Sequence, residues 1–65
     1  MKITINGKSE TIQPCSVGEL VRRKGLNSAA LVVELNHQIV KQETWDTTQL
    51  NENDMLELLS FVGGG

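Results

Sequence analysis

One segment of the chain, residues 16–25, contains the sequence patterns that begin a helix and those that end one. The fold of the whole chain must therefore include this helix. Ser16 and Glu19 have the spacing of a capping box, in which each side chain bonds to the backbone N–H of the other residue. Gly25 follows three basic residues and suits the left-handed conformation that ends many helices. Between these signals the apolar residues recur at helical spacing, at Val17, Leu20 and Val21. We therefore predict one short helix over residues 17–24.

The segments on both sides of this helix have the patterns of short strands. Ile3 and Ile5 alternate with polar residues, and the following Asn6-Gly7 pair is a strong hairpin signal because both residues tolerate positive φ. A turn at 51–54 is expected to place Asn53 at positive φ. Trp45 is expected to anchor a brief helical turn at 43–45. We predict strands at 2–5, 10–13, 31–36, 39–40 and 55–62.

This order of elements predicts an α+β fold. One helix between two strand pairs must cover one face of a sheet, and the last strand can pair parallel to the first. The chain has 65 residues, which is room for one domain. We therefore expect residues 1–65 to form a mixed sheet of four to five strands packed on one main helix. Residues 63–65 are expected to be a flexible tail, because glycine loses the most chain entropy on ordering.

The last strand also predicts a binding surface. Alternation places Leu56 and Leu58 in the core and leaves Leu59 and Phe61 on the opposite face of the sheet. Exposed apolar side chains beside a binding tail meet a partner, so Leu59, Phe61 and Val62 are predicted docking residues. The alternative is the opposite phase, in which Met55, Leu59 and Phe61 are the buried set.

The residues able to do chemistry are too few for an enzyme. Cys15 and His37 are the one cysteine and the one histidine, so there is no internal disulfide and no ligand set for a closed zinc site. Cys15 is better explained as an apolar residue that precedes the helix and packs on Leu20 than as a nucleophile activated by His37. A chain this short cannot enclose both a core and a deep substrate cavity. We predict no catalytic residue and no metal site.

Composition and charge narrow the choice of partners. A free thiol fits a reducing compartment and the N-terminus lacks the apolar run of a signal peptide, so we expect a cytoplasmic monomer without membrane contact. Residues 1–30 carry five basic and two acidic side chains, whereas residues 31–65 carry one basic and six acidic side chains. The acidic half argues against nucleic acid near the C-terminal glycines and suits a basic protein surface.

The most specific motif is the run Gly63, Gly64 and Gly65. Together with the length, the element order and the segments VVELNHQIVKQETW (32–45) and LNENDMLELLSFV (50–62), it resembles the ubiquitin-like β-grasp fold. Within that fold the chain is most similar to the ThiS family, the sulfur carriers of thiamine biosynthesis. Many relatives have Gly where this chain has Asn53, and Asn can adopt the same conformation.

The resemblance implies a carrier that supplies the reacting atom while partner enzymes supply the catalysis. A ubiquitin-activating-like adenylyltransferase (ThiF-type) would use ATP and magnesium to adenylate the carboxylate of Gly65. A sulfur donor such as a cysteine desulfurase would then convert it to a thiocarboxylate, and thiazole synthase (ThiG-type) would receive the sulfur. Gly63 and Gly64 would enter the partner's active site, where a β-carbon would narrow the path.

Two other classes of protein share these features. The small subunit of molybdopterin synthase has the same fold and Gly-Gly tail, but it is usually longer. A ubiquitin-like module, either conjugated to lysines or acting by docking alone, is the second alternative. Deleting Gly65 distinguishes a docking module from a carrier, because only the carrier needs the terminal residue.

Overall fold

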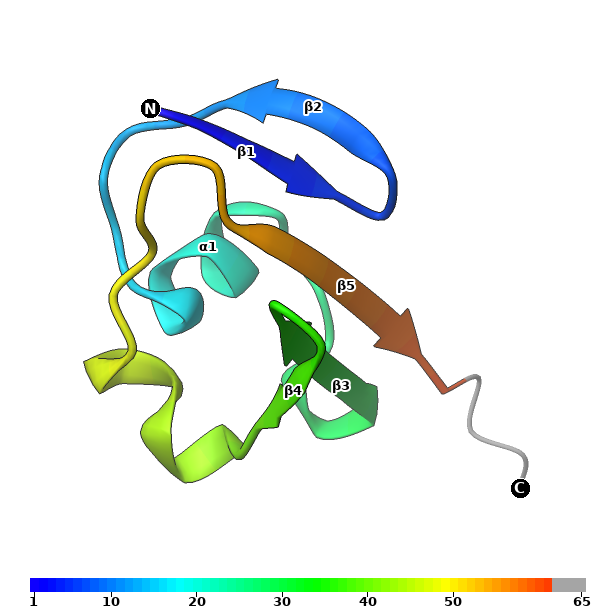
Figure 1. The fold of residues 1–65 in the computed structure, drawn as a ribbon. Helices are drawn as coiled ribbons and strands as arrows, with labels where there is room; N and C mark the ends of the chain where they lie inside the picture. Colours follow the sequence, from blue (N-terminus) through cyan, green and yellow to red (C-terminus); the bar gives the residue numbers. More distant parts are fainter. Residues whose placement is uncertain (62–65) are drawn as a thin grey trace.

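The computed structural model describes residues 1–61, in which one five-stranded sheet packs against one α-helix (Figure 1). The strands are β1 (Lys2–Ile5), β2 (Lys8–Thr11), β3 (Leu31–Leu35), β4 (Gln38–Val40) and β5 (Met55–Ser60). The helices are α1 (Val17–Arg23) and two short 3-10 helices, η1 (Ser28–Ala30) and η2 (Gln42–Thr47). The α+β architecture predicted from the sequence is confirmed.

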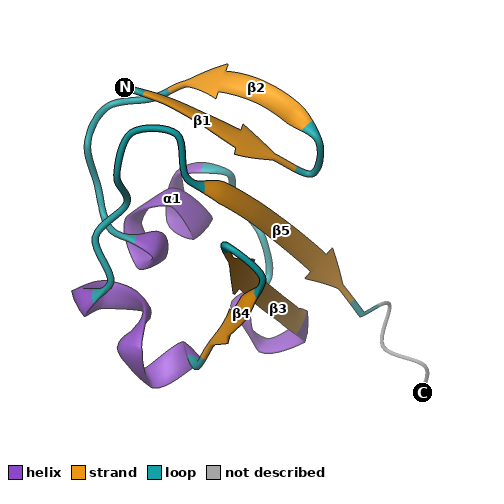
Figure 2. Cartoon of the chain, in the orientation of Figure 1, coloured by secondary structure: helices purple, strands orange, loops and turns teal. Residues whose placement is uncertain are grey.

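The strands are ordered β2-β1-β5-β3-β4, so the first and last strands are neighbours in the middle of the sheet (Figure 2). β5 pairs parallel with β1 and antiparallel with β3, which confirms the predicted parallel closure. β1 and β2 form one antiparallel hairpin, and β3 and β4 form the other. β5 is therefore held along both of its edges by strands from different parts of the chain.

The first hairpin has the predicted turn but begins its second strand earlier than predicted. Asn6 and Gly7 have φ of 49° and 81°, the left-handed conformations that a two-residue hairpin turn requires. Such a turn pairs Ile5 directly with Lys8, so β2 starts at Lys8 and ends at Thr11. The predicted strand at 10–13 was wrong by two residues because the turn itself sets the register.

The second hairpin follows the same rule. Asn36 and His37 have φ of 51° and 71°, and Leu35 pairs directly with Gln38. Gln38 was predicted as part of the turn and is instead the first residue of β4. The turn is a two-residue turn made of Asn36 and His37, so the next residue already pairs with the opposite strand.

Helix α1 begins and ends as its sequence predicts. The Glu19 N–H donates to the Ser16 hydroxyl at 3.2 Å, and the Ser16 N–H donates to the Glu19 carboxylate at 3.1 Å. At the other end Gly25 has a φ of 67°, and the Leu26 N–H donates to the Val21 carbonyl at 3.3 Å. The Gly25 N–H also donates to the Arg22 carbonyl at 3.1 Å. These two bonds form a Schellman motif, which gives hydrogen-bond donors to carbonyls that have no partner within the helix.

The core lies between α1 and the sheet, and its buried apolar residues are Ile3, Ile5, Cys15, Val17, Leu20, Val21, Leu31, Val33, Trp45, Leu50, Leu56 and Leu58. Trp45 is the largest of them and lies on η2, as the sequence predicts, although this helix extends beyond the expected 43–45. Its indole N–H donates to the Val40 carbonyl at 2.8 Å, so the ring is buried without an unpaired polar atom.

Gly18 lies where α1 and η2 come close together. A β-carbon at this position would overlap the carboxylate of Asp46, and the same carboxylate accepts a hydrogen bond from Arg22 at 3.0 Å. A glycine in a helix interior costs about 0.5–1 kcal/mol relative to alanine. This cost is offset by the close packing of η2, which carries Trp45 into the core.

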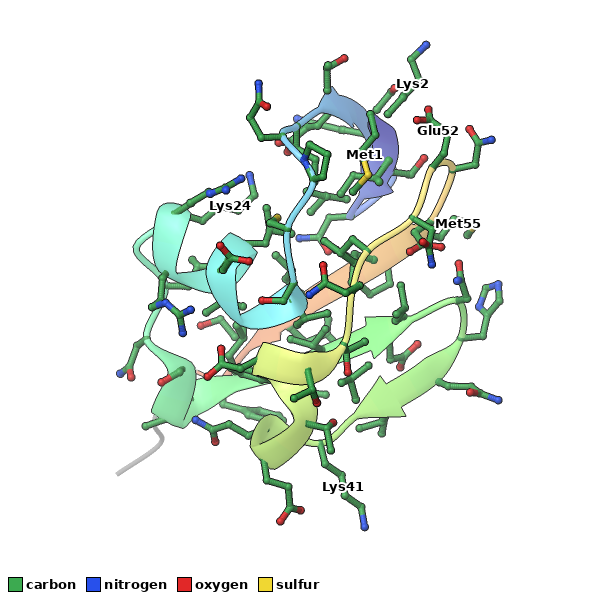
Figure 3. All side chains as sticks on the ribbon, turned by 90° about the vertical axis from the view of Figure 1, so that its left-hand side faces the viewer. Met1, Lys2, Lys24, Lys41, Glu52 and Met55 are labelled. Atoms are coloured by element: carbon green, nitrogen blue, oxygen red, sulfur yellow. The ribbon has the colours of Figure 1, made fainter. Side chains whose placement is uncertain are left out.

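The turn before β5 holds the start of the chain. Asn53 has the predicted positive φ of 70°, and its N–H donates to the Lys2 carbonyl at 2.8 Å. The Lys2 N–H donates in return to the Glu52 carboxylate at 2.9 Å, and Figure 3 shows these two residues side by side. None of the helices within residues 1–61 is long and apolar enough to cross a membrane.

The predicted last strand, 55–62, is longer than the one observed. β5 ends at Ser60, and Phe61 follows it outside the strand. Val62 and the glycines Gly63, Gly64 and Gly65 lie outside the described residues, as does the predicted flexible tail.

Loss of the helix cap tests how much of the fold depends on α1. We expect Ser16→Ala to lower the free energy of unfolding by about 1 kcal/mol, because the buried Ser16 hydroxyl is the acceptor for the N–H of Glu19. Urea denaturation would measure this loss. Ser9→Ala is the control, because Ser9 is exposed on β2 and its change should stay within about 0.5 kcal/mol. Equal losses in the two variants would contradict the role of the cap.

Candidate functional site

The side chains of β5 alternate between the core and solvent in the predicted phase. Leu56 and Leu58 are 1% and 9% exposed, whereas Leu59 and Phe61 are 49% and 61% exposed. Met55 is also exposed, so the opposite phase, with Met55, Leu59 and Phe61 buried, is wrong. Two large apolar side chains are in contact with solvent at the end of the central strand, immediately before the glycine run.

The strand register shows which residues share this exposed face. Directly paired residues of neighbouring strands point to the same side of a sheet. Leu59 pairs with Val32, Glu57 pairs with Glu34, and Glu34 pairs on its other side with Ile39. Met55 belongs to the same alternation of β5. We call the part of this surface on β3, β4 and β5 the open face; it consists of Val32, Glu34, Ile39, Met55, Glu57 and Leu59.

The open face is more apolar than the sequence analysis predicted. Ile39 is 68% exposed and Met55 is 43% exposed, yet neither was named as a docking residue. Ile39 was missed because its side depends on the pairing of β4 with β3, which a three-residue strand does not reveal by alternation. The exposure of Met55 could have been predicted, because it lies four residues before Leu59 in β5 and alternation places both side chains on the same side of the strand.

Asn6 follows the last residue of β1, and its side chain and backbone form hydrogen bonds with β5. The Asn6 side chain accepts a hydrogen bond from the Leu58 N–H at 2.7 Å and donates to the Leu58 carbonyl at 3.3 Å. Its own backbone N–H donates to the Leu56 carbonyl at 2.9 Å. On the other edge the Phe61 N–H donates to the Ala30 carbonyl at 2.7 Å. Hydrogen bonds thus hold the backbone of this segment in place as far as Phe61.

The structure does not bring the other candidate residues together. Cys15 is 3% exposed and belongs to the same core cluster as Leu20, in agreement with its predicted packing role. His37 is exposed in the turn between β3 and β4. No hydrogen bond joins these two residues, and within residues 1–61 no three metal-binding side chains form a group. The described residues therefore expose apolar side chains at the end of β5, and Cys15 and His37 do not meet in a common site.

Comparison with known proteins identifies the family. The family model described as "ThiS family" matches residues 3–65. The solved structure of a thiamine biosynthesis protein (ThiS) from Geobacter metallireducens is 33% identical, covers 100% of both chains and superposes with a TM-score of 0.87. The sulfur carrier protein ThiS of Bacillus subtilis is 30% identical over 77% of this chain and 76% of its own length.

A longer protein also contains a region like this chain. A thiazole synthase of Paramagnetospirillum magneticum is 33% identical over the whole of this chain, which spans 20% of the length of that protein. The family model covers nearly all of the sequence, and the Geobacter structure has the same β-grasp fold over its full length. The chain therefore belongs to the ThiS family.

Proposed function

We propose that this member of a sulfur-carrier family acts in thiamine biosynthesis and carries sulfur as a thiocarboxylate on Gly65. The observation that carries the proposal is the match to the ThiS family through residue 65, which includes all three glycines. Members of this family are carriers, so the prediction that the chain is not an enzyme is confirmed.

Activation by a partner is required by the chemistry of a carboxylate. At neutral pH the C-terminal carboxylate is ionised, and the anion resists attack by a nucleophile. An adenylyltransferase of the ThiF type would let a Gly65 oxygen attack the α-phosphate of ATP, held with magnesium in the partner, so that pyrophosphate leaves. The acyl-adenylate then has a good leaving group. The persulfide sulfur of a donor such as a cysteine desulfurase attacks the acyl carbon, and AMP leaves. A thiol then attacks the donor's sulfur in the resulting acyl disulfide, which releases the thiocarboxylate and leaves the donor and the thiol joined as a disulfide.

The glycines suit a segment that must enter a narrow site. Gly63 and Gly64 have no β-carbon, so the chain at these positions is as thin as a polypeptide can be. The same segment would enter the adenylyltransferase first and the sulfur acceptor second. We propose thiazole synthase, of the ThiG type, as the acceptor, because thiazole synthases from other organisms contain a region similar to this chain.

Docking would precede the entry of the glycines. Leu59 and Phe61 are exposed beside the end of β5, and Val62 follows them in the sequence. Exposed large apolar side chains are the usual anchors of protein interfaces. We propose that these three residues contact the partner and bring the glycine run to its active site.

The molybdopterin synthase small subunit and a ubiquitin-like docking or modifier module are the competing functions. The similarity over 100% of a ThiS chain of Geobacter favours the thiamine carrier over the molybdopterin subunit. A docking module makes no demand on Gly65, and a conjugated modifier would become linked to lysines of other proteins. The experiment below separates a sulfur carrier from a docking module and from a modifier. Binding of the chain to thiazole synthase would separate the thiamine carrier from the molybdopterin subunit.

Removal of Gly65 tests the position of the sulfur. We expect the chain without Gly65 to gain no sulfur, while the full chain gains the mass of one oxygen-to-sulfur exchange. The measurement is intact-protein mass spectrometry after incubation with a ThiF-type adenylyltransferase, ATP, magnesium and a sulfur source. Equal thermal melting of the two chains is the control for folding. Sulfur uptake by the shortened chain would contradict the proposal, and high-mass adducts on other proteins would indicate a modifier.

Substitution of Phe61 tests the docking role. We expect Phe61→Asp to weaken binding to the adenylyltransferase at least about tenfold, or about 1.4 kcal/mol, because an apolar anchor becomes a charge. The free energy of unfolding should change by no more than about 0.5 kcal/mol, since the side chain is 61% exposed. Calorimetric titration and urea denaturation would measure the two effects.

The control for Phe61→Asp makes the same kind of change elsewhere. Gln42 is exposed at the start of η2, outside the sheet, so Gln42→Asp adds the same charge there and should leave the affinity for the adenylyltransferase unchanged. A large loss of stability without a change in affinity for Phe61→Asp would show that Phe61 is a structural residue.

A further inference from the structure

Two carboxylates lie directly opposite each other on the open face. Glu34 of β3 and Glu57 of β5 are register partners, so their side chains leave adjacent backbone positions on the same side of the sheet. Like charges in this arrangement destabilise a sheet. The pair therefore costs the isolated chain some stability, and the fold by itself offers no reason for it.

No ion pair within residues 1–61 involves Glu34 or Glu57. The ion pairs of this part of the chain are Arg22 with Asp46 and Lys24 with Glu10. Both involve residues of α1 or the residue that caps it, on the other side of the sheet. Within residues 1–61 neither of the two carboxylates accepts a hydrogen bond, whereas the carboxylates of Glu10, Glu19 and Glu52 do.

The surroundings of the two carboxylates are apolar. Glu57 lies between Met55 and Leu59 along β5, and Glu34 lies beside Ile39 on β4. A partner that covers Leu59 and Ile39 must also remove water from the carboxylates. Burial of an unpaired carboxylate is strongly unfavourable, so the covering surface must supply a positive charge.

We propose that thiazole synthase docks on the open face and places an arginine side chain between Glu34 and Glu57. The planar guanidinium has five N–H donors and can bond to two carboxylates at once, which suits this pair better than a lysine ammonium. Apolar side chains of the same partner cover Ile39 and Leu59. This inference rests on the proposed function, because it assigns thiazole synthase as the sulfur acceptor.

Neutral variants of the same shape test the inference. We expect the double variant Glu34→Gln with Glu57→Gln to bind thiazole synthase from the same organism at least about tenfold more weakly than the parent chain. The same variant should melt at the same temperature or a few degrees higher, because the like-charge repulsion is removed. Calorimetric titration at two salt concentrations and thermal melting monitored by circular dichroism provide the measurements. The parent's affinity should fall more steeply with salt than the variant's.

Two further variants make the result specific. Glu43→Gln removes the same charge from η2, where Glu43 is exposed outside the sheet, and it should leave the affinity unchanged. Glu57→Lys places a cation opposite Glu34 within the chain itself. It should raise the melting temperature and abolish the site for the partner's arginine, so stability and affinity move in opposite directions.

The possible outcomes separate this inference from the proposed function. Unchanged affinity of the double glutamine variant would overturn the arginine contact while leaving the sulfur carrier in place. Failure of the parent chain to bind thiazole synthase would overturn the partner assignment and this inference together. Sulfur uptake at Gly65 is measured without thiazole synthase, so it reports on the carrier function independently of either result.

Discussion

The parallel pairing of β1 with β5 is the interaction on which the rest of the structure depends. It joins the first and the last strand in the centre of the sheet, and in the sheet formed by residues 1–61 β5 is the strand that links the β1–β2 hairpin to the β3–β4 hairpin. β1 ends at Ile5, so the Asn6 side chain continues the pairing by bonding to both backbone groups of Leu58. One side chain of the β1–β2 turn thus extends the contact between β1 and β5 beyond the end of β1.

Local signals in the sequence were sufficient to predict the fold. The capping box of Ser16, the left-handed Gly25 and Asn53, and the anchoring role of Trp45 all depend on residues close in sequence, and all are confirmed. The errors lie at strand ends, as at Lys8 and Gln38. Turn geometry decides those positions, and it acts through hydrogen-bond register, which composition does not encode.

The functional surface was only partly predictable for a related reason. Leu59 and Phe61 follow from alternation within one strand, so their exposure could be derived from the sequence. The pairing of Glu34 with Glu57 depends on which strands are neighbours and on their register. The same holds for the pairing of Glu34 with Ile39. The roles of Gly63, Gly64 and Gly65 rest on family membership, because these residues lie outside the described part of the chain.

The topology also determines how the protein would respond to force. Residue 2 starts β1 and residue 60 ends β5, and the two strands run parallel as neighbours. Tension between these points would slide one strand along the other, so the hydrogen bonds between them would share the load instead of breaking one after another. A chain proposed to enter partner enzymes through its C-terminus would therefore keep its fold under a pull on its last strand.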